Sequence, residues 1–239
     1  HLDSFREYGL YVCVFYKDCA LRFVIIDDRI PVFATSGRVV FGQCKDPNEL
    51  WVPLIEKAYA KLHGSYKALI GGYVHLGLAD LTGYVPRLVG LKPGYMGYSD
   101  PFDDPGHRDQ LWTLLETYQK WGCLMGTSIQ SKPGEGGKVE ANAGNGLKMG
   151  HAYSFLACGV INVSASDGKG STNVRLVRLR NPWGFGEWTG PWSDNTPERE
   201  KYSAEIKRVF ATENEAEDVD AIGNDGTFYM TFEDWMKHF

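Results

Sequence analysis

The sequence predicts an α+β fold in which helices flank antiparallel sheets. Segments 11–16 and 21–26 are rich in β-branched and aromatic residues, and the short polar stretch between them is typical of a hairpin turn. Segments 151–163 and 173–181 have the same character and surround Asp167-Gly168, a dipeptide that favours a hairpin. Two other segments carry the 3.6-residue periodicity of amphipathic helices. Hairpins combined with such helices indicate a mixed fold with antiparallel pairing.

The clearest helix is expected over residues 46–64. Asp46 suits the N-cap, Pro47 the first helical position and Glu49 the capping-box position, while Gly64 closes the C-terminus. Apolar residues recur at helical spacing and predict one buried stripe, made by Leu50, Leu54, Ala58 and Leu62.

A second helix is expected over residues 108–121, with a buried face made by Leu111, Leu114, Leu115 and Tyr118. Residues 123–129 follow as a strand. The stretch 132–150 contains six glycines, too many for regular structure, and is expected to be a long mobile loop that leads into residue 151. Glycine clustering places a boundary after residue 83, so we expect one subdomain over residues 1–83 and a second over 84–239.

Composition excludes several classes of protein. The net charge of −5 is spread along the chain, which offers no basic surface for nucleic acid or an anionic membrane. No apolar run approaches the roughly 20 residues of a membrane span, and no secretory signal opens the sequence. Five cysteines at irregular spacing, without a Cys-x-x-Cys pair, indicate a reducing, cytoplasmic (intracellular) compartment and no structural zinc. Because the sequence enters an expected sheet soon after His1, we interpret it as a fragment.

The second predicted hairpin brings His151 close to Asn181. In an antiparallel hairpin the residue numbers of each pair add up to the same total. With the turn at Asp167-Gly168, this places Asn181 within about three positions of the residue opposite His151. A histidine in such an apolar run is usually an ordinary core residue. Beside an asparagine, the imidazole can instead be oriented by the carboxamide oxygen and activate a thiol, as in a Cys-His-Asn triad. Trp183 is near enough in sequence to shield this pair from water, although simple core packing explains it equally well.

Longer motifs resemble the calpain family of cysteine proteases. They occur in fixed order along nearly the whole chain: IDDRIP at 26–31, ELWVPLIEKAYAKLHGSYKAL at 49–69, GHAYS at 150–154, RNPWG at 180–184, EWTGPWSD at 187–194 and DGTFYMTFEDWMKHF at the C-terminus. The resemblance implies a papain-like calpain protease core, with an antiparallel sheet or barrel and flanking helices in the second subdomain. It also implies a calcium-dependent endopeptidase that performs limited proteolysis of intracellular protein substrates, with further calpain domains in the parent chain.

The same resemblance assigns roles at the site. His151 would be the catalytic base, Asn181 would orient it and Trp183 would shield the pair. Gly72 and Gly150 match positions whose backbone pairs with an extended substrate, and glycine permits such a close approach. Either glycine is equally well explained as a turn residue.

The sequence departs from the family at the nucleophile. The family's nucleophilic cysteine lies upstream of these motifs, and none of the five cysteines matches it. Cys158 follows His151 by seven residues, which is roughly 23 Å along a strand, and the odd spacing points it to the other face. We therefore expect the chain to supply the His/Asn half of the triad and to be inactive alone. The alternative is a catalytically inactive calpain-like scaffold or regulatory binding domain.

Calcium is the cofactor that the resemblance implies. Glu49 matches a ligand in the first subdomain, although it also fits a helix-capping role. The ligands of a second site match Glu187, Asp194, Gly223 (through its carbonyl) and Asp225, which are the hard oxygen donors that calcium prefers. Thr227 stands where the family usually has a glutamate, and this loss is expected to weaken the site.

Overall fold

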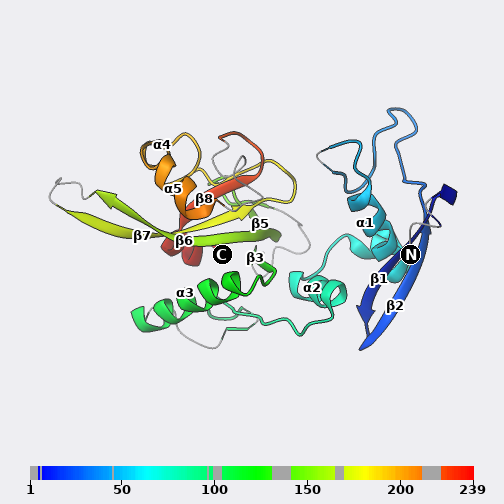
Figure 1. Ribbon diagram of the computed structural model, residues 1–239, viewed down its shortest axis with the longest axis horizontal. Coiled ribbons are helices and arrows are strands. Elements are labelled where there is room, and N and C mark those ends of the chain that lie inside the picture. The colour runs from blue at the N-terminus through cyan, green and yellow to red at the C-terminus, as the bar shows by residue number, and fades with distance from the viewer. Residues whose placement is uncertain are drawn as a thin grey trace. The chain divides into compact units, whose positions relative to one another are not determined.

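The computed structural model describes most of the chain, namely residues 5, 7–44, 46–95, 97–98, 104–130, 141–164, 170–211 and 222–239. The chain divides into two compact units, His1–Arg87 and Leu88–Phe239. Both combine helices with antiparallel strands, which confirms the predicted α+β class (Figure 1). No helix within the described ranges is long and apolar enough to cross a bilayer.

The first unit is built on the predicted hairpin of β1 (Leu10–Lys17) and β2 (Ala20–Asp27). Asp18 and Cys19 form its two-residue turn with φ angles of 51° and 58°, the left-handed conformation of a tight hairpin. One face of the hairpin packs against α1 (Trp51–Leu62) in a core made by Phe15, Val24, Ile26, Leu54 and Ala58.

The helix α1 begins four residues later than predicted, with Leu50 in place of Asp46 at the N-cap position. The Asp46 carboxylate accepts from the backbone N–H of Asn48 at 2.8 Å, which forms a local turn in place of a helix cap. The helix instead starts after Leu50, without a side-chain cap. The predicted capping-box role of Glu49 is therefore wrong, since Glu49 lies outside the helix, exposed, and accepts from the Trp51 indole at 3.2 Å.

A short 3-10 turn, η2 (Tyr66–Leu69), and the helix α2 (Val74–Thr82) complete the first unit. Asp80 of α2 is buried and ties the helix to the other elements. Its carboxylate accepts from Lys17 Nζ at 3.0 Å and Tyr59 OH at 2.9 Å, and it contacts His63 Nε2 at 3.2 Å.

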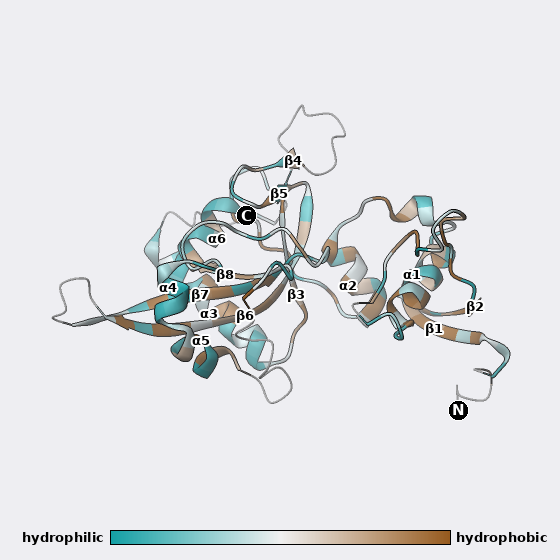
Figure 2. Cartoon of the chain, turned by 90° about the horizontal axis from the view of Figure 1, so that it is seen from above, coloured by the Kyte–Doolittle hydropathy of each residue, from teal (hydrophilic) through white to brown (hydrophobic). Residues whose placement is uncertain are grey.

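The second unit is built on a four-stranded antiparallel sheet in the order β3-β6-β7-β8. The strands are β3 (Met125–Ile129), β6 (His151–Ser164), β7 (Ser171–Arg180) and β8 (Thr227–Thr231). Within the described residues this sheet is open, so the barrel alternative does not apply. Apolar residues run along its central strands β6 and β7 (Figure 2). The turn predicted at Asp167-Gly168 lies outside the described residues.

Helices cover both faces of this sheet (Figure 1). On one face, α3 (Pro105–Lys120) and α6 (Phe232–His238) contribute to the larger core. On the other, α5 (Ser203–Phe210) packs in a second core, with α4 (Pro197–Lys201) before it. The buried residues of α3 are Leu111, Trp112 and Leu115, and the partly buried Leu114 packs against the same core. The predicted face was therefore right for its three leucines and missed Trp112.

A β-bulge interrupts β6 between Phe155 and Ala157, which leaves Leu156 as an extra residue. Phe155 and Cys158 therefore lie in the same hydrophobic core, on one side of the sheet. The prediction that Cys158 points away from the face of His151 is wrong, because the bulge reverses the alternation of side chains.

The glycine-rich stretch before His151 is partly regular. Its described portion forms a small hairpin of β4 (Ala141–Asn142) and β5 (Lys148–Met149). Gly144 and Gly146 have φ angles of 85° and 83°, so glycines here permit turns within a hairpin. The prediction of a structureless loop is wrong for residues 141–149, and its earlier part lies outside the described residues.

Candidate active site

His151 and Asn181 meet at one end of the central strands. His151 is the first residue of β6, and Asn181 follows the last residue of β7. The imidazole Nε2 lies 2.9 Å from Asn181 Oδ1. Both residues are buried, with 7% and 0% of their surface exposed, so water does not compete strongly for this hydrogen bond.

The surroundings of Asn181 fix the orientation of its carboxamide. Its Nδ2 donates to the carbonyls of Phe185 at 2.8 Å and Gly186 at 3.0 Å, and its Oδ1 accepts from the backbone N–H of Trp183 at 3.1 Å. Reversing the amide would place its oxygen against two carbonyls. The oxygen therefore faces His151, so Nε2 must carry a hydrogen and Nδ1 is the basic nitrogen of the neutral ring.

Aromatic rings enclose the imidazole. The rings of His151 and Trp183 have centroids 4.9 Å apart, and Tyr153 meets the imidazole edge-on at 5.0 Å. Trp183 keeps 43% of its surface exposed, so it covers the pair from the solvent side. This arrangement suits a side chain that shields the His151–Asn181 hydrogen bond.

The two glycines singled out from the sequence lie in different units. Gly150 directly precedes His151, has a φ angle of 67° and donates its N–H to the Ile129 carbonyl at 2.7 Å. Gly72 lies before α2 in the first unit, and a Cβ added there would meet no atom within 4 Å. Glu49 also belongs to the first unit.

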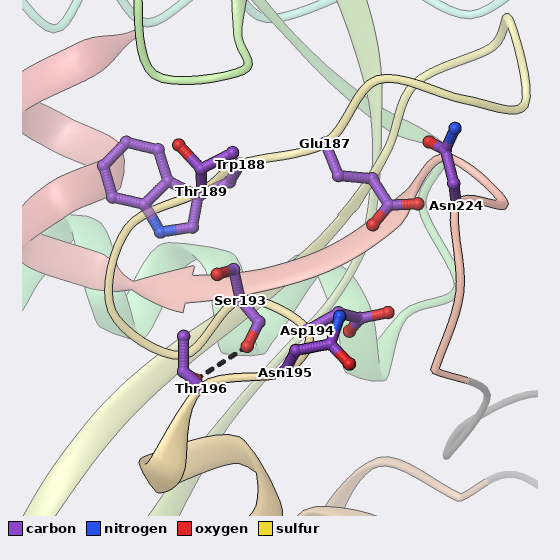
Figure 3. A pocket seen from close by; sticks show the side chains of 8 residues that line it. All are labelled: Glu187, Trp188, Thr189, Ser193, Asp194, Asn195, Thr196 and Asn224. Carbon is purple, nitrogen blue, oxygen red and sulfur yellow. Dashed lines mark hydrogen bonds between the residues drawn. The ribbon is translucent and has the colours of Figure 1, made fainter.

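Carboxylates border a pocket of about 420 Å³ in the second unit (Figure 3). The pocket is lined by Glu187, Trp188, Thr189, Ser193, Asp194, Asn195, Thr196 and Asn224. Glu187 accepts from the backbone N–H of Gly226 at 2.8 Å, and Asp194 accepts from that of Gly223 at 2.8 Å. The neighbouring Asp225 accepts from the Thr227 N–H at 2.7 Å.

These acids repel one another. Burial raises the pKa of the Glu187 carboxyl, and the charges of Asp194 and Asp225 raise it further. Burial also raises the pKa of Asp194, which backbone hydrogen bonding from Gly223 and the nearby Arg199 charge partly offset. Burial is thus the main cause of both shifts, and mutual repulsion of the carboxylates adds to it.

The donor set fits calcium by its chemistry, since carboxylate and carbonyl oxygens are hard ligands. The arrangement of these donors differs from that of the calcium site expected from the sequence. In the described part of the chain, no three Asp, Glu, His or Cys side chains converge as metal ligands. The Gly223 carbonyl accepts from the Asp225 N–H at 2.9 Å and is thereby engaged locally.

Two neighbouring residues were missed by the sequence analysis. Gly226 accepts from the Asn181 N–H at 2.8 Å through its carbonyl, and its φ angle of 88° suits only glycine well. Asn224 accepts from the Gly186 N–H at 2.8 Å through Oδ1. Asn224-Asp225-Gly226 is a recognisable turn sequence, but nothing in the sequence identifies its partners. These bonds connect the carboxylate pocket directly to Asn181.

The cysteines offer no partner for His151 within this unit's core. Burial, with a smaller effect from the Glu116 charge, raises the pKa of Cys158 to about 12. A thiol with so high a pKa carries almost no thiolate at neutral pH, and thiolate is the nucleophilic form. Cys123 is exposed and lies two residues before the start of β3.

Comparison with known proteins places the chain in a family. The sequence model of the calpain family cysteine proteases matches residues 2–239. Calpain-A of Drosophila melanogaster is 37% identical over 217 residues, covering 90% of this chain and 23% of the relative. Human calpain-12 is 36% identical over 216 residues, covering 90% of the chain and 25% of the relative. Human calpain-9 is 36% identical over 232 residues, covering 97% of this chain and 29% of the relative.

The chain therefore spans about a quarter of the length of these relatives. The matched region includes both compact units and the His151–Asn181 pair. The chain belongs to the calpain family of cysteine proteases.

Proposed function

We propose that this chain is part of a cysteine endopeptidase, in which it supplies the base and its orienting residue. The observation that carries the proposal is the 2.9 Å contact between His151 Nε2 and Asn181 Oδ1, with the carboxamide held in one orientation. In this arrangement His151 Nδ1 accepts the proton of a thiol and later donates a proton to the leaving amine. Asn181 keeps the ring in the required tautomer, and Trp183 excludes water.

The nucleophilic cysteine is proposed to come from a part of the parent protein outside this chain. The substrates are extended segments of intracellular proteins, whose backbone would pair with Gly72 and Gly150. All five cysteines are free thiols, which supports a cytoplasmic location, and the partial coverage of the relatives supports further domains in the parent.

We also propose that calcium controls the enzyme. Glu187, Asp194 and Asp225 would hold the ion in the second unit, with Gly223 as a carbonyl donor and Glu49 at a separate site in the first. A bound Ca²⁺ would neutralise the repelling carboxylates. Because Gly226 donates to Glu187 and accepts from Asn181, a shift of the 222–226 segment reaches the orienting residue through one hydrogen bond.

The alternative function is a catalytically inactive calpain-like scaffold or regulatory binding domain. None of the five cysteines of this chain matches the family's nucleophile, and the His151–Asn181 pair is compatible with both functions. The parent protein decides between the two. If the parent cleaves casein in the presence of calcium and loses this activity with His151→Ala, it is a protease. If the parent is inactive although His151 and Asn181 are both intact, the scaffold is supported.

The chain alone is expected to show no peptidase activity, because it lacks an activated thiolate. The measurement is incubation with casein and excess calcium, with and without a thiol-alkylating reagent. Cleavage that alkylation abolishes would identify one of the five cysteines as a nucleophile and contradict the assignment.

Replacing Thr227 with glutamate is expected to tighten calcium binding, because it adds a fourth carboxylate beside Asp225. The melting temperature should rise in Thr227→Glu only when calcium is present. Calorimetric titration measures the affinity directly. Thr172→Glu, at an exposed position of β7, is the matched control for the added charge, and Asp225→Asn should weaken binding. Equal calcium responses in all variants would mean that these acids are an ordinary solvated surface.

A further inference from the structure

The β-bulge at Leu156 determines where His151 lies relative to β7. Before the bulge, Ser154 pairs with Arg180, and beyond it the register is shifted by one residue. The first register places His151 diagonally across from Asn181, on the same face of the sheet. If the second register continued without the extra residue, the side chain of His151 would turn to the opposite face. The His151–Asn181 contact therefore depends on the bulge.

Gln119, in the last turn of α3, holds the strand immediately after this bulge. Its Oε1 accepts from the backbone N–H of Cys158 at 2.6 Å, and its Nε2 donates to the Cys158 carbonyl at 3.1 Å. The strand β3 begins at Met125, opposite Phe155, so its backbone does not extend to Cys158. The Gln119 carboxamide thus takes the place of a neighbouring strand for one residue of β6.

The interaction requires the particular chemistry of glutamine. Cys158 is only 4% exposed, and a buried N–H and carbonyl both need partners. One carboxamide supplies an acceptor and a donor together, whereas glutamate lacks the donor and methionine lacks both. The helix that carries Gln119 is itself fixed, because Trp112 and Leu115 are buried in the larger core.

We propose that Gln119 is a positioning residue for the His151–Asn181 pair: it fixes the bulge at Leu156 and so fixes the register in which the two side chains meet. The catalytic consequence rests on the proposed function. The hydrogen bond between His151 and Asn181 is a property of this chain, however, and can be measured apart from peptidase activity.

The first experiment measures the His151 imidazole N–H by ¹⁵N NMR on the 239-residue chain. In Gln119→Met, exchange of the Nε2 hydrogen with water should accelerate by about tenfold, the effect of losing one net hydrogen bond. Gln119→Glu keeps the acceptor for Cys158 and should fall between Gln119→Met and the native chain. Gln110→Met, an exposed position on the same helix, is the matched control and should leave exchange unchanged.

The second experiment measures peptidase kinetics in the parent protein. Gln119→Met should lower kcat by about tenfold or more while KM changes little, because misplacing a catalytic group affects the chemical step.

Equal exchange rates of the His151 Nε2 hydrogen in folded Gln119→Met and Gln110→Met would overturn the proposal. If Gln119→Met does not fold, Gln119→Glu provides the same comparison. If His151→Ala left the peptidase activity of the parent unchanged, the proposed function would be refuted. The exchange rates of the His151 Nε2 hydrogen would still decide the role of Gln119.

Discussion

His151→Ala in the parent protein is expected to lower kcat by about 10⁴-fold or more, which is the scale on which triad members act. The substitution removes the group that we propose accepts the thiol proton and protonates the leaving amine. KM should change little, because His151 lies at the reacting centre and contributes little to binding the rest of the substrate. The measurement is steady-state cleavage of a fluorogenic peptide at saturating calcium.

Two further variants make this result specific. His75→Ala, in α2 of the first unit, removes a histidine outside the pair and should leave kcat within about twofold. Asn181→Ala should cost less than His151→Ala, about 10²-fold, since the ring can still reach the required tautomer without its orienting partner. If His151→Ala and Asn181→Ala both kept kcat near that of the native protein, the triad interpretation would fail.

Gly146→Ala is expected to destabilise the second unit more than any other alanine substitution in the β4–β5 hairpin. A Cβ at this position would lie 1.8 Å from the Glu187 carbonyl oxygen, a backbone atom that cannot move freely. The turn of the β4–β5 hairpin is also hydrogen-bonded to the segment that carries Glu187, because the Thr189 N–H donates to the Asn145 carbonyl at 3.1 Å. The clash would therefore separate the hairpin before His151 from the segment that carries Glu187.

Gly144→Ala separates the two causes of this effect. Gly144 has a φ angle of 85°, close to the 83° of Gly146, but a Cβ there meets nothing within 4 Å. Both variants lose about 1–2 kcal/mol from the left-handed backbone. Only Gly146→Ala adds the cost of overpacking, about 1–3 kcal/mol more. Urea unfolding followed by tryptophan fluorescence reports on this unit, and equal losses in both variants would show that the contact with Glu187 does not matter.

Local patterns in the sequence were enough to predict the longer elements of the fold, but not the short helices or the strands β4, β5 and β8. The hairpins, the two long helices and the placement of His151 and Asn181 at the same end of two paired strands follow from periodicity and turn chemistry, which act over a few residues. Their meeting on one face depends on the bulge. The start of α1 was wrong because Asp46 can form a local turn or cap a helix with the same carboxylate, and the sequence does not distinguish these.

Contacts between distant segments could not be predicted in this way. The bulge at Leu156 has no composition signal, since its side chain is an ordinary apolar residue, and the carboxamide that bonds to the strand beyond it belongs to Gln119, 37 positions before Leu156. The bonds from Gly226 to Asn181 and Glu187 likewise join segments separated by long stretches of chain. The acids around the pocket could be named from the family resemblance, but their separation from one another could not.

The residue that orients His151 is an amide, and this determines how the His151–Asn181 pair responds to its environment. A carboxamide does not ionise at any pH at which the protein is folded, and it carries no charge for salt to screen. The position of the hydrogen on His151 is therefore set by the geometry of four neutral hydrogen bonds around Asn181. Sensitivity to ionic strength belongs instead to Glu187 and Asp194, whose charges interact across the pocket.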